Sequence, residues 1–288
     1  MTVKDKILQG RTYLGIELGS TRIKAVLIDD SFSVIASGSK QWENRFENGC
    51  WTYSLDDIHG GIQACYKDLA ENVKAQYGIY PETYGAMGIS AMMHGYMAFD
   101  KNDKLLVPFR TWRNTMTAQA AGELTKLLGF SIPQRWSIAH LYQAVLNKEA
   151  HVPYIAYINT LAGYVHKRLT DRFEVGVGEA SGIFPVEGIG YKKEYCEPTE
   201  KSLAEKGFDH KLKDILPAVR NAGEKGAVLT EEGAKFLDPE GRLKAGVPVC
   251  PPEGDAGTGM VATDSVLKKT GNLSLIHISE PTRLQLIS

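Results

Sequence analysis

The sequence predicts an α/β domain whose sheet mixes antiparallel and parallel strands. Three short strand-like runs near the start of the chain are joined by tight turns, which indicates antiparallel neighbours. A long amphipathic helix and further short apolar strands follow, and this order is typical of a connection that crosses back to the same sheet. With 288 residues, of which 43% are apolar, the chain is long enough to bury a sizeable core.

The first predicted strands are Tyr13–Leu18, Ile23–Ile28 and Ser33–Ala36. They are separated by Gly19-Ser20-Thr21 and by Asp29-Asp30, which are residue types that favour turns. Because each connection is short enough for a hairpin, we expect these three strands to run antiparallel to one another.

A helix is predicted over Asp56–Gln76, where Ser54 and Asp57 have the spacing of an N-cap residue and its capping-box partner. The apolar residues of this segment recur at helical spacing and should pack on the sheet: Ile58, Ile62, Cys65, Leu69 and Val73. Two more short strands are predicted after it, at Tyr84–Ser90 and Gly95–Phe99, before a turn at Asp100–Asp103.

The middle of the chain, about residues 117–169, has helical periodicity, with a break at Ile132-Pro133 and a last helical stretch over Ile155–Leu169. A glycine-rich, strand-like stretch is predicted over Phe173–Gly190, and a short helix within Glu200–Lys225. The turn-rich segment 251–259 follows the apolar run Val247–Val249.

Charge and composition exclude several classes of function. The 33 Lys and Arg residues are balanced by 34 Asp and Glu residues, so the net charge of −1 lacks the basic excess of proteins that bind nucleic acid or anionic membranes. No apolar run is long enough for a membrane span or a signal peptide. The four cysteines form no C-x-x-C pair, which indicates reduced thiols and no zinc site. We therefore expect a cytoplasmic protein that acts on small molecules.

The first predicted hairpin has residues that suit a nucleotide phosphate. Gly19 lets the backbone approach a ligand closely, Ser20 and Thr21 offer amide and hydroxyl donors, and Lys24 adds a positive charge. Glu17 could hold Mg²⁺ directly or through water. Spacing alone favours an ordinary surface hairpin, because the segment is neither a dinucleotide fingerprint nor a Walker A loop.

The segment resembles the first phosphate motif of the actin, Hsp70 and sugar-kinase superfamily, and specifically that of the FGGY carbohydrate kinases. The resemblance implies an actin-like, ribonuclease H-like domain with a mixed sheet flanked by helices, and it implies ATP and Mg²⁺ as cofactors. The family usually has Asp at the position of Glu17.

Two further segments resemble the same family, in the same order along the chain. Gly88–Gly95 and Thr111–Asn114 resemble the stretches that line the sugar pocket, which implies Met93, His94, Trp112, Arg113 and Asn114 as substrate-binding residues. Such side chains give a polyol both polar partners and an apolar wall. Taken singly, His94 is more often a hydrogen-bonded histidine of the core, and Trp112 more often a simple core residue.

The third segment, Pro248–Gly259, resembles the motif whose aspartate is the catalytic base, which implies that role for Asp255. On the residues alone, Asp255 could instead be the N-cap of a helix that opens at Ala256. The turn Glu179–Gly182 resembles another family turn loosely, and we interpret it as structural.

The last segment, residues 273–288, resembles an in-frame translation of a transposase sequencing adapter. An edge strand over Leu273–Ile278 is the alternative on alternation alone. We expect residues 1–272 to be the N-terminal domain of an FGGY kinase, residues 273–288 to be a non-native tail, and the chain to have little turnover without a second domain.

These observations predict ATP-dependent phosphorylation of a sugar hydroxyl, on a ketopentose such as xylulose or on a polyol. The expected partners are the sugar and ATP, and the sequence leaves a homodimer open. An Hsp70-like or actin-like ATPase and a non-catalytic sugar-binding pseudokinase are the alternatives.

Overall fold

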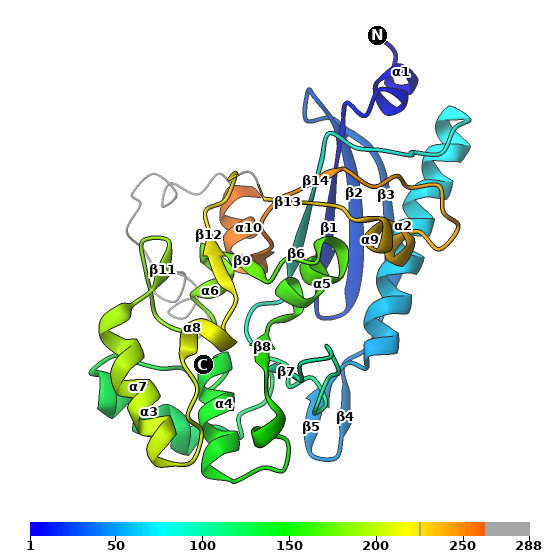
Figure 1. The fold of residues 1–288 in the computed structure, drawn as a ribbon. Helices are drawn as coiled ribbons and strands as arrows, with labels where there is room; N and C mark the ends of the chain where they lie inside the picture. The colour runs from blue at the N-terminus through cyan, green and yellow to red at the C-terminus, as the bar shows by residue number, and fades with distance from the viewer. Residues whose placement is uncertain (225, 263–288) are drawn as a thin grey trace, which may run out of the picture.

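The computed structural model describes residues 1–224 and 226–262, so the predicted tail at residues 273–288 lies outside the described residues. A seven-stranded sheet forms the centre of the described part, in the order β13-β14-β6-β1-β2-β3 with β15 beside β6 (Figure 1). Its strands are β1 (Thr12–Leu18), β2 (Arg22–Asp29), β3 (Val34–Gln41), β6 (Ala86–Ala91), β13 (Ala227–Val228), β14 (Pro248–Val249) and β15 (Glu253–Gly254).

The sheet has the predicted mixture of strand directions. Strands β1, β2 and β3 are successive antiparallel neighbours, whereas β6 runs parallel to β1, and β14 and β15 run parallel to β6. The register places Lys24 opposite Glu17, Glu17 opposite Ser90, and Ser90 opposite Glu253. Four polar side chains from four strands therefore lie in one row across the sheet.

Helix α2 (Leu55–Tyr77) confirms the predicted amphipathic helix. Ser54 and Asp57 form a reciprocal capping box at its start, and Gly78 ends it in the left-handed conformation. All five predicted apolar residues on its inner face are buried. Strand β3 approaches the helix so closely that a Cβ at Gly38 would lie 2.4 Å from the Leu69 nitrogen, so only glycine fits there.

One hydrophobic core lies between the sheet and three helices. Helices α5 (Leu161–Thr170) and α9 (Glu231–Leu237) pack together with α2 against the sheet residues Leu14, Ile16 and Ile89. The short helix α1 (Val3–Leu8) lies at the N-terminal end of the chain, beyond the edge of the sheet, and α10 (Asp255–Ala262) follows β15 directly (Figure 1).

A second core is built by residues between Tyr96 and Leu216, and its helices lie below and to the left of the sheet in Figure 1. Its helices are α3 (Ala118–Leu128), α4 (Ser137–Leu146), α7 (Lys193–Glu205) and α8 (Leu212–Ile215), with Trp136, Phe184 and Phe208 buried among them. The remaining elements are β4 (Arg45–Glu47), β5 (Cys50–Thr52), β7 (Met97–Phe99), η1 (Val152–Tyr154), β8 (Tyr157–Asn159), β9 (Glu174–Gly176), α6 (Val177–Ala180), β10 (Val186–Glu187), β11 (Gly190–Tyr191) and β12 (Ala218–Arg220).

One predicted helix has different bounds in the structure, and another lies where it was predicted. The stretch Ile155–Leu169 is not one helix, because Tyr157–Asn159 pairs with β7 as strand β8 and Thr160 then caps α5 by accepting from the Gly163 N–H. Pairing with β7 therefore overrides the helical periodicity at the start of this stretch. The short helix predicted within Glu200–Lys225 is confirmed by α8, which ends directly before Leu216-Pro217. Helix α7, which includes Pro198, begins before that range, at Lys193.

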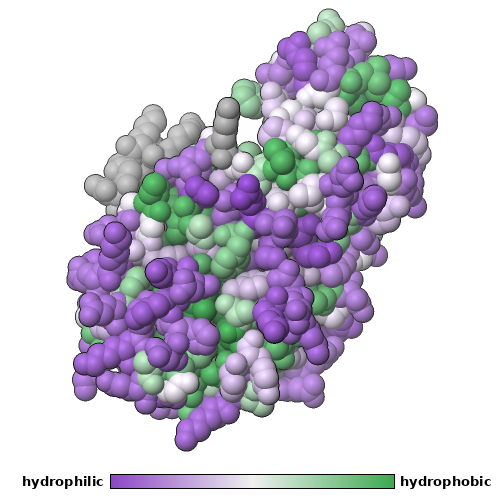
Figure 2. Space-filling model, viewed as in Figure 1, coloured by the Kyte–Doolittle hydropathy of each residue, from purple (hydrophilic) through white to green (hydrophobic). Residues whose placement is uncertain are grey.

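Polar side chains cover most of the surface in Figure 2, and apolar side chains are exposed in separate patches. Among the described residues, no helix combines the length and hydrophobicity required to cross a bilayer.

Candidate active site

The β1–β2 turn, Gly19–Thr21, is held from one side by two aromatic residues. The Trp42 Nε1–H donates to the Gly19 carbonyl oxygen (2.7 Å), and the Tyr53 hydroxyl donates to the Ser20 carbonyl oxygen (2.5 Å). The two rings are stacked with centroids 4.1 Å apart. Sequence reasoning missed both anchors, because they are separated from the turn by 23 and 33 positions.

Hydrogen bonds hold the carbonyl groups of this turn, whereas the N–H and O–H donors of Ser20 and Thr21 remain available to a ligand. The Thr21 carbonyl oxygen also accepts, from the Trp42 N–H at 3.3 Å. Ser20 and Thr21 are exposed, and their amide and hydroxyl groups have no protein acceptor among residues 1–224 and 226–262. The local geometry is therefore that of a donor-rich turn, which suits an anionic ligand.

Glu17 and Lys24 face each other across the hairpin below this turn. The Lys24 Nζ lies 3.5 Å from Glu17 Oε2, and both side chains are about half exposed. Such an exposed ion pair contributes little to stability, so a ligand or cation can replace either partner at small cost.

Asp255 is the first residue of α10 and lies at the end of the sheet where β15 stops. Its Oδ1 accepts hydrogen bonds from the Met93 N–H (3.2 Å) and the Ala256 N–H (3.0 Å). The helix start that the sequence left open as an alternative to a catalytic role is therefore real. Both descriptions apply to one residue, since a helix N-terminus also stabilises a carboxylate.

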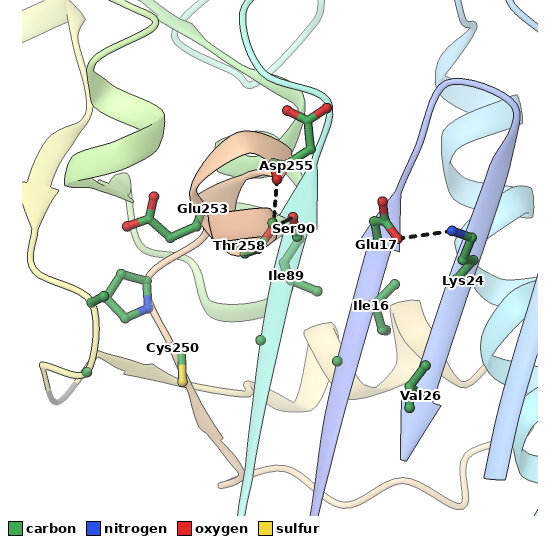
Figure 3. A pocket seen from close by; sticks show the side chains of 16 residues that line it. Ile16, Glu17, Lys24, Val26, Ile89, Ser90, Cys250, Glu253, Asp255 and Thr258 are labelled. Atoms are coloured by element: carbon green, nitrogen blue, oxygen red, sulfur yellow. Dashed lines mark hydrogen bonds and ion pairs between the residues drawn. The ribbon is translucent and has the colours of Figure 1, made fainter. Parts of the chain in front are cut away.

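One cavity of about 680 Å³ brings the predicted base together with the predicted metal and phosphate residues (Figure 3). Glu17 and Lys24 line it from the hairpin, Ser90 from β6, and Asp255 from α10. The Ser90 hydroxyl lies 2.9 Å from the Thr258 hydroxyl and joins β6 to α10. The structure thus gathers residues that are more than 200 positions apart in the chain. The turn residues Gly19, Ser20 and Thr21 do not line this cavity themselves.

The segment Met93–Gly95 follows β6 in an unusual backbone conformation. His94 and Gly95 both have positive φ, 70° and 90°. A Cβ at Gly95 would lie 2.6 Å from the Arg110 carbonyl oxygen, which explains the glycine. Met93 is 6% exposed and touches the site through its backbone bond to Asp255, and neither Met93 nor His94 lines the cavity.

The other predicted sugar residues lie next to the hairpin formed by β4 and β5. The Arg113 guanidinium lies 3.6 Å from the centre of the Trp51 ring, a cation–π geometry. Asn114 is buried, and its amide accepts from the Trp51 N–H (2.9 Å) and donates to the Trp51 carbonyl oxygen (2.8 Å). The Asn114 amide is therefore engaged in joining two loops, and Trp112 is partly buried against the main core. Trp51, which sequence reasoning did not select, contacts both Arg113 and Asn114.

Two more carboxyl groups, those of Glu253 and Glu179, lie near Asp255, and Glu253 also lines the cavity. Burial raises the pKa of Glu253, although backbone N–H groups, including that of Glu179, oppose the shift. Glu179 is fully buried, and burial raises the pKa of its carboxyl group to about 8. The negative charges of Glu253 and Asp255 also raise this pKa, whereas an interaction with the Thr160 hydroxyl group lowers it. The sequence interpretation of Glu179–Gly182 as a structural turn gave no indication of this buried acid.

Comparison with known proteins decides the family. Residues 12–262 match the N-terminal domain of the FGGY family of carbohydrate kinases. The chain belongs to this family. A xylulose kinase of Haemophilus influenzae is 24% identical over 277 residues, which cover 91% of this chain and 54% of that protein.

Solved structures of FGGY kinases share the fold. The xylulose kinase of Rhodospirillum rubrum has a TM-score of 0.69 at 17% identity, covering 88% of this chain and 51% of that one. The gluconate kinase of Lactobacillus acidophilus has a TM-score of 0.67 at 18% identity, covering 88% and 50%. Identities this low establish the actin-like fold alone. The chain spans about half the length of the relatives that it matches.

Proposed function

We propose that this chain is the sugar-binding half of a carbohydrate kinase, which transfers the γ-phosphoryl group of ATP to a hydroxyl group of a ketopentose such as xylulose, or of a polyol. The observation that carries the proposal is the shared cavity in which Asp255, Glu17 and Lys24 meet. A carboxylate, a second carboxylate and a cation are the groups that phosphoryl transfer to an alcohol requires. Family membership supports this choice over an Hsp70-like or actin-like ATPase.

In this proposal Asp255 is the general base. As the sugar oxygen attacks the γ-phosphorus in line, its hydroxyl proton passes to the Asp255 carboxylate, and the bond from phosphorus to the leaving oxygen of ADP breaks. The Met93 and Ala256 N–H groups fix the orientation of the carboxylate. The proposed sugar pocket is formed or supported by Met93, His94, Trp112, Arg113 and Asn114. Asn114 would act indirectly, because its side chain is hydrogen-bonded to the Trp51 backbone.

The phosphate end of the site is proposed to lie at the β1–β2 hairpin. The Ser20 and Thr21 donors, at a turn that begins with Gly19, and the Lys24 ammonium would bind phosphate oxygens. Mg²⁺ prefers oxygen ligands and keeps several waters, and the exposed Glu17 carboxylate fits that requirement. When bound, Mg²⁺ would neutralise charge on the phosphates. Glu253 is the other acidic residue in the row of polar side chains across the sheet, and its carboxyl group accepts hydrogen bonds from backbone N–H groups.

Sugar binding by the chain itself tests this proposal. Isothermal titration calorimetry with xylulose, gluconate and glycerol should detect at least one ligand, and His94→Ala should weaken its binding tenfold or more, a loss of about 1.4 kcal/mol. Asp255→Asn keeps the shape of the base and should leave the dissociation constant within a few fold. Equal heats for all three compounds and for the His94 variant would argue against a sugar site at this position.

A further inference from the structure

Glu179 is a charged residue type in a place where residues 1–224 and 226–262 offer it no counterion. Its side chain is fully buried, and neither carboxyl oxygen has a hydrogen-bond partner at normal geometry, although the Thr160 side chain lies close by. Most buried carboxyl groups are paired or hydrogen-bonded, so an unpaired one requires a reason in the function or in the packing.

The Glu179 carboxyl group packs directly behind the residue that precedes the proposed base. A Cβ added at Gly254 would lie 2.7 Å from Glu179 Oε2 and 2.0 Å from Met93 Cγ. Gly254 therefore has room for a hydrogen only, because Glu179 and Met93 both occupy the space that a side chain at this position would need. Asp255, the next residue, binds the Met93 N–H.

The turn that carries Glu179 also supports the predicted sugar residues. A Cβ at Gly182 would lie 2.6 Å from His94 Nδ1 and 3.2 Å from Met93 Cε. The turn is fastened to β15 by the Glu179 N–H, which donates to Glu253 Oε2 (3.0 Å). One four-residue turn therefore contacts the acceptor segment at Gly182 and the base segment at Glu179.

Among the described residues, the groups that face Glu179 are acidic or uncharged. Glu253 on β15 and Asp255 on α10 are acidic, and Tyr191 on β11 has a buried hydroxyl group whose pKa burial and Glu179 both raise. His94 lies against the other end of the same turn, at Gly182. An ionised Glu179 would face two carboxylates in a dry environment, so the uncharged acid is the form that the packing accommodates.

We propose that Glu179 is a positioning residue, whose uncharged carboxyl group forms the buried wedge that sets Asp255 and Met93 in their relative places. The proposal rests on the proposed function, in which Asp255 is the base. It gives the three neighbouring carboxyl groups different tasks: Asp255 faces the cavity, Glu253 fastens the turn, and Glu179 fills the space behind Gly254. Separation of neighbouring carboxyl groups by environment is a common arrangement in catalytic sites.

A consequence is that ionisation of Glu179 must disturb both neighbours. Above pH 8 a buried negative charge would appear beside Gly254, and repulsion would displace the turn or the Asp255 carboxylate. The Met93 N–H, which donates a hydrogen bond to Asp255 Oδ1, is therefore a direct reporter of this event.

The test follows the Met93 amide of the ¹⁵N-labelled chain from pH 6 to pH 9 by NMR, together with the side-chain carboxyl carbon of ¹³C-labelled Glu179. Both signals should change together near pH 8 in the wild-type chain. Glu179→Gln keeps the shape without the proton, so the Met93 step should disappear. Glu187→Gln, at an exposed position on β10, is the matched control and should keep the step.

Where a sugar ligand is found, its affinity should fall several-fold between pH 6.5 and pH 9 in the wild type and stay constant in Glu179→Gln.

The wild-type titration alone can overturn the proposal, so it does not depend on the folding of a variant. A Glu179 carboxyl carbon that titrates in the normal acidic range, or a Met93 step that persists in Glu179→Gln, would contradict it. Because these signals need no sugar, they separate the two claims. A linked step in a chain that binds no sugar supports the wedge and counts against the proposed function.

Discussion

The buried acid at position 179 predicts an unusual dependence of stability on pH. The pKa of Glu179 rises from 4.5 to about 8 on folding, mainly because of burial. The folded chain holds this proton more tightly than the unfolded chain does. Protonated Glu179 therefore contributes its full share to the free energy of unfolding below pH 4.5, and this share is lost as pH rises from 4.5 through 8. At about 1.4 kcal/mol per pKa unit, the loss from this one group is at most about 5 kcal/mol.

The variant Glu179→Gln removes this titration while keeping the side chain nearly isosteric. Between pH 5.5 and pH 8.5, its unfolding free energy should gain about 3 kcal/mol relative to the wild type. The buried histidines His140 and His166 have lowered pKa values and favour the folded state more as pH rises, but they are present in both proteins and cancel in the difference.

Urea unfolding followed by circular dichroism at four pH values in this range measures the difference directly. Glu187→Gln serves as the control, because its exposed side chain should give a curve parallel to that of the wild type. A difference between Glu179→Gln and the wild type that stays constant from pH 5.5 to pH 8.5 would refute the reasoning, since it would mean that Glu179 titrates normally in the folded chain.

Three further substitutions test the geometry of the site and the core. Tyr53→Phe removes the hydroxyl group that anchors the β1–β2 turn, and the unfolding free energy in urea should fall by about 1 kcal/mol. Gly182→Ala would place a Cβ 2.6 Å from His94 Nδ1 and should weaken sugar binding tenfold or more in calorimetry, whereas Gly190→Ala, with no atom within 4 Å, should leave it unchanged. Gly60→Ala adds a methyl group in open space on helix α2, and the free energy of unfolding in urea should rise by about 1 kcal/mol because alanine favours the helix.

Local patterns were sufficient to predict the first half of the sheet and helix α2. The Gly19–Thr21 and Asp29-Asp30 turns lie between strands that pair as predicted, because short turn-rich connections leave few other arrangements. The Ser54 capping box begins α2 where its spacing indicated. Strand β8 was missed, since it pairs with β7 residues that lie 58 to 62 positions away, and no local periodicity encodes that pairing.

The candidate site was likewise only partly predictable from the sequence. The motifs located Asp255, Glu17 and Lys24, and the fold brings these three to one cavity. Periodicity and spacing could not reveal that the Asn114 amide binds the Trp51 backbone, or that Trp42 and Tyr53 hold the β1–β2 turn, because these bonds join loops that are distant in sequence. The burial of Glu179 is likewise a result of tertiary packing, which only the folded chain specifies.

The central claim is that Asp255 takes a proton from a sugar hydroxyl during phosphoryl transfer. Its most direct test is sugar-dependent release of ADP by the complete enzyme that contains this domain, with the wild type and Asp255→Asn compared at saturating ATP and sugar. We expect ADP release only when sugar is present, and a rate about a thousandfold lower in Asp255→Asn with nearly unchanged sugar affinity. ADP release that is independent of sugar, or an Asp255→Asn enzyme that keeps its rate, would contradict the claim.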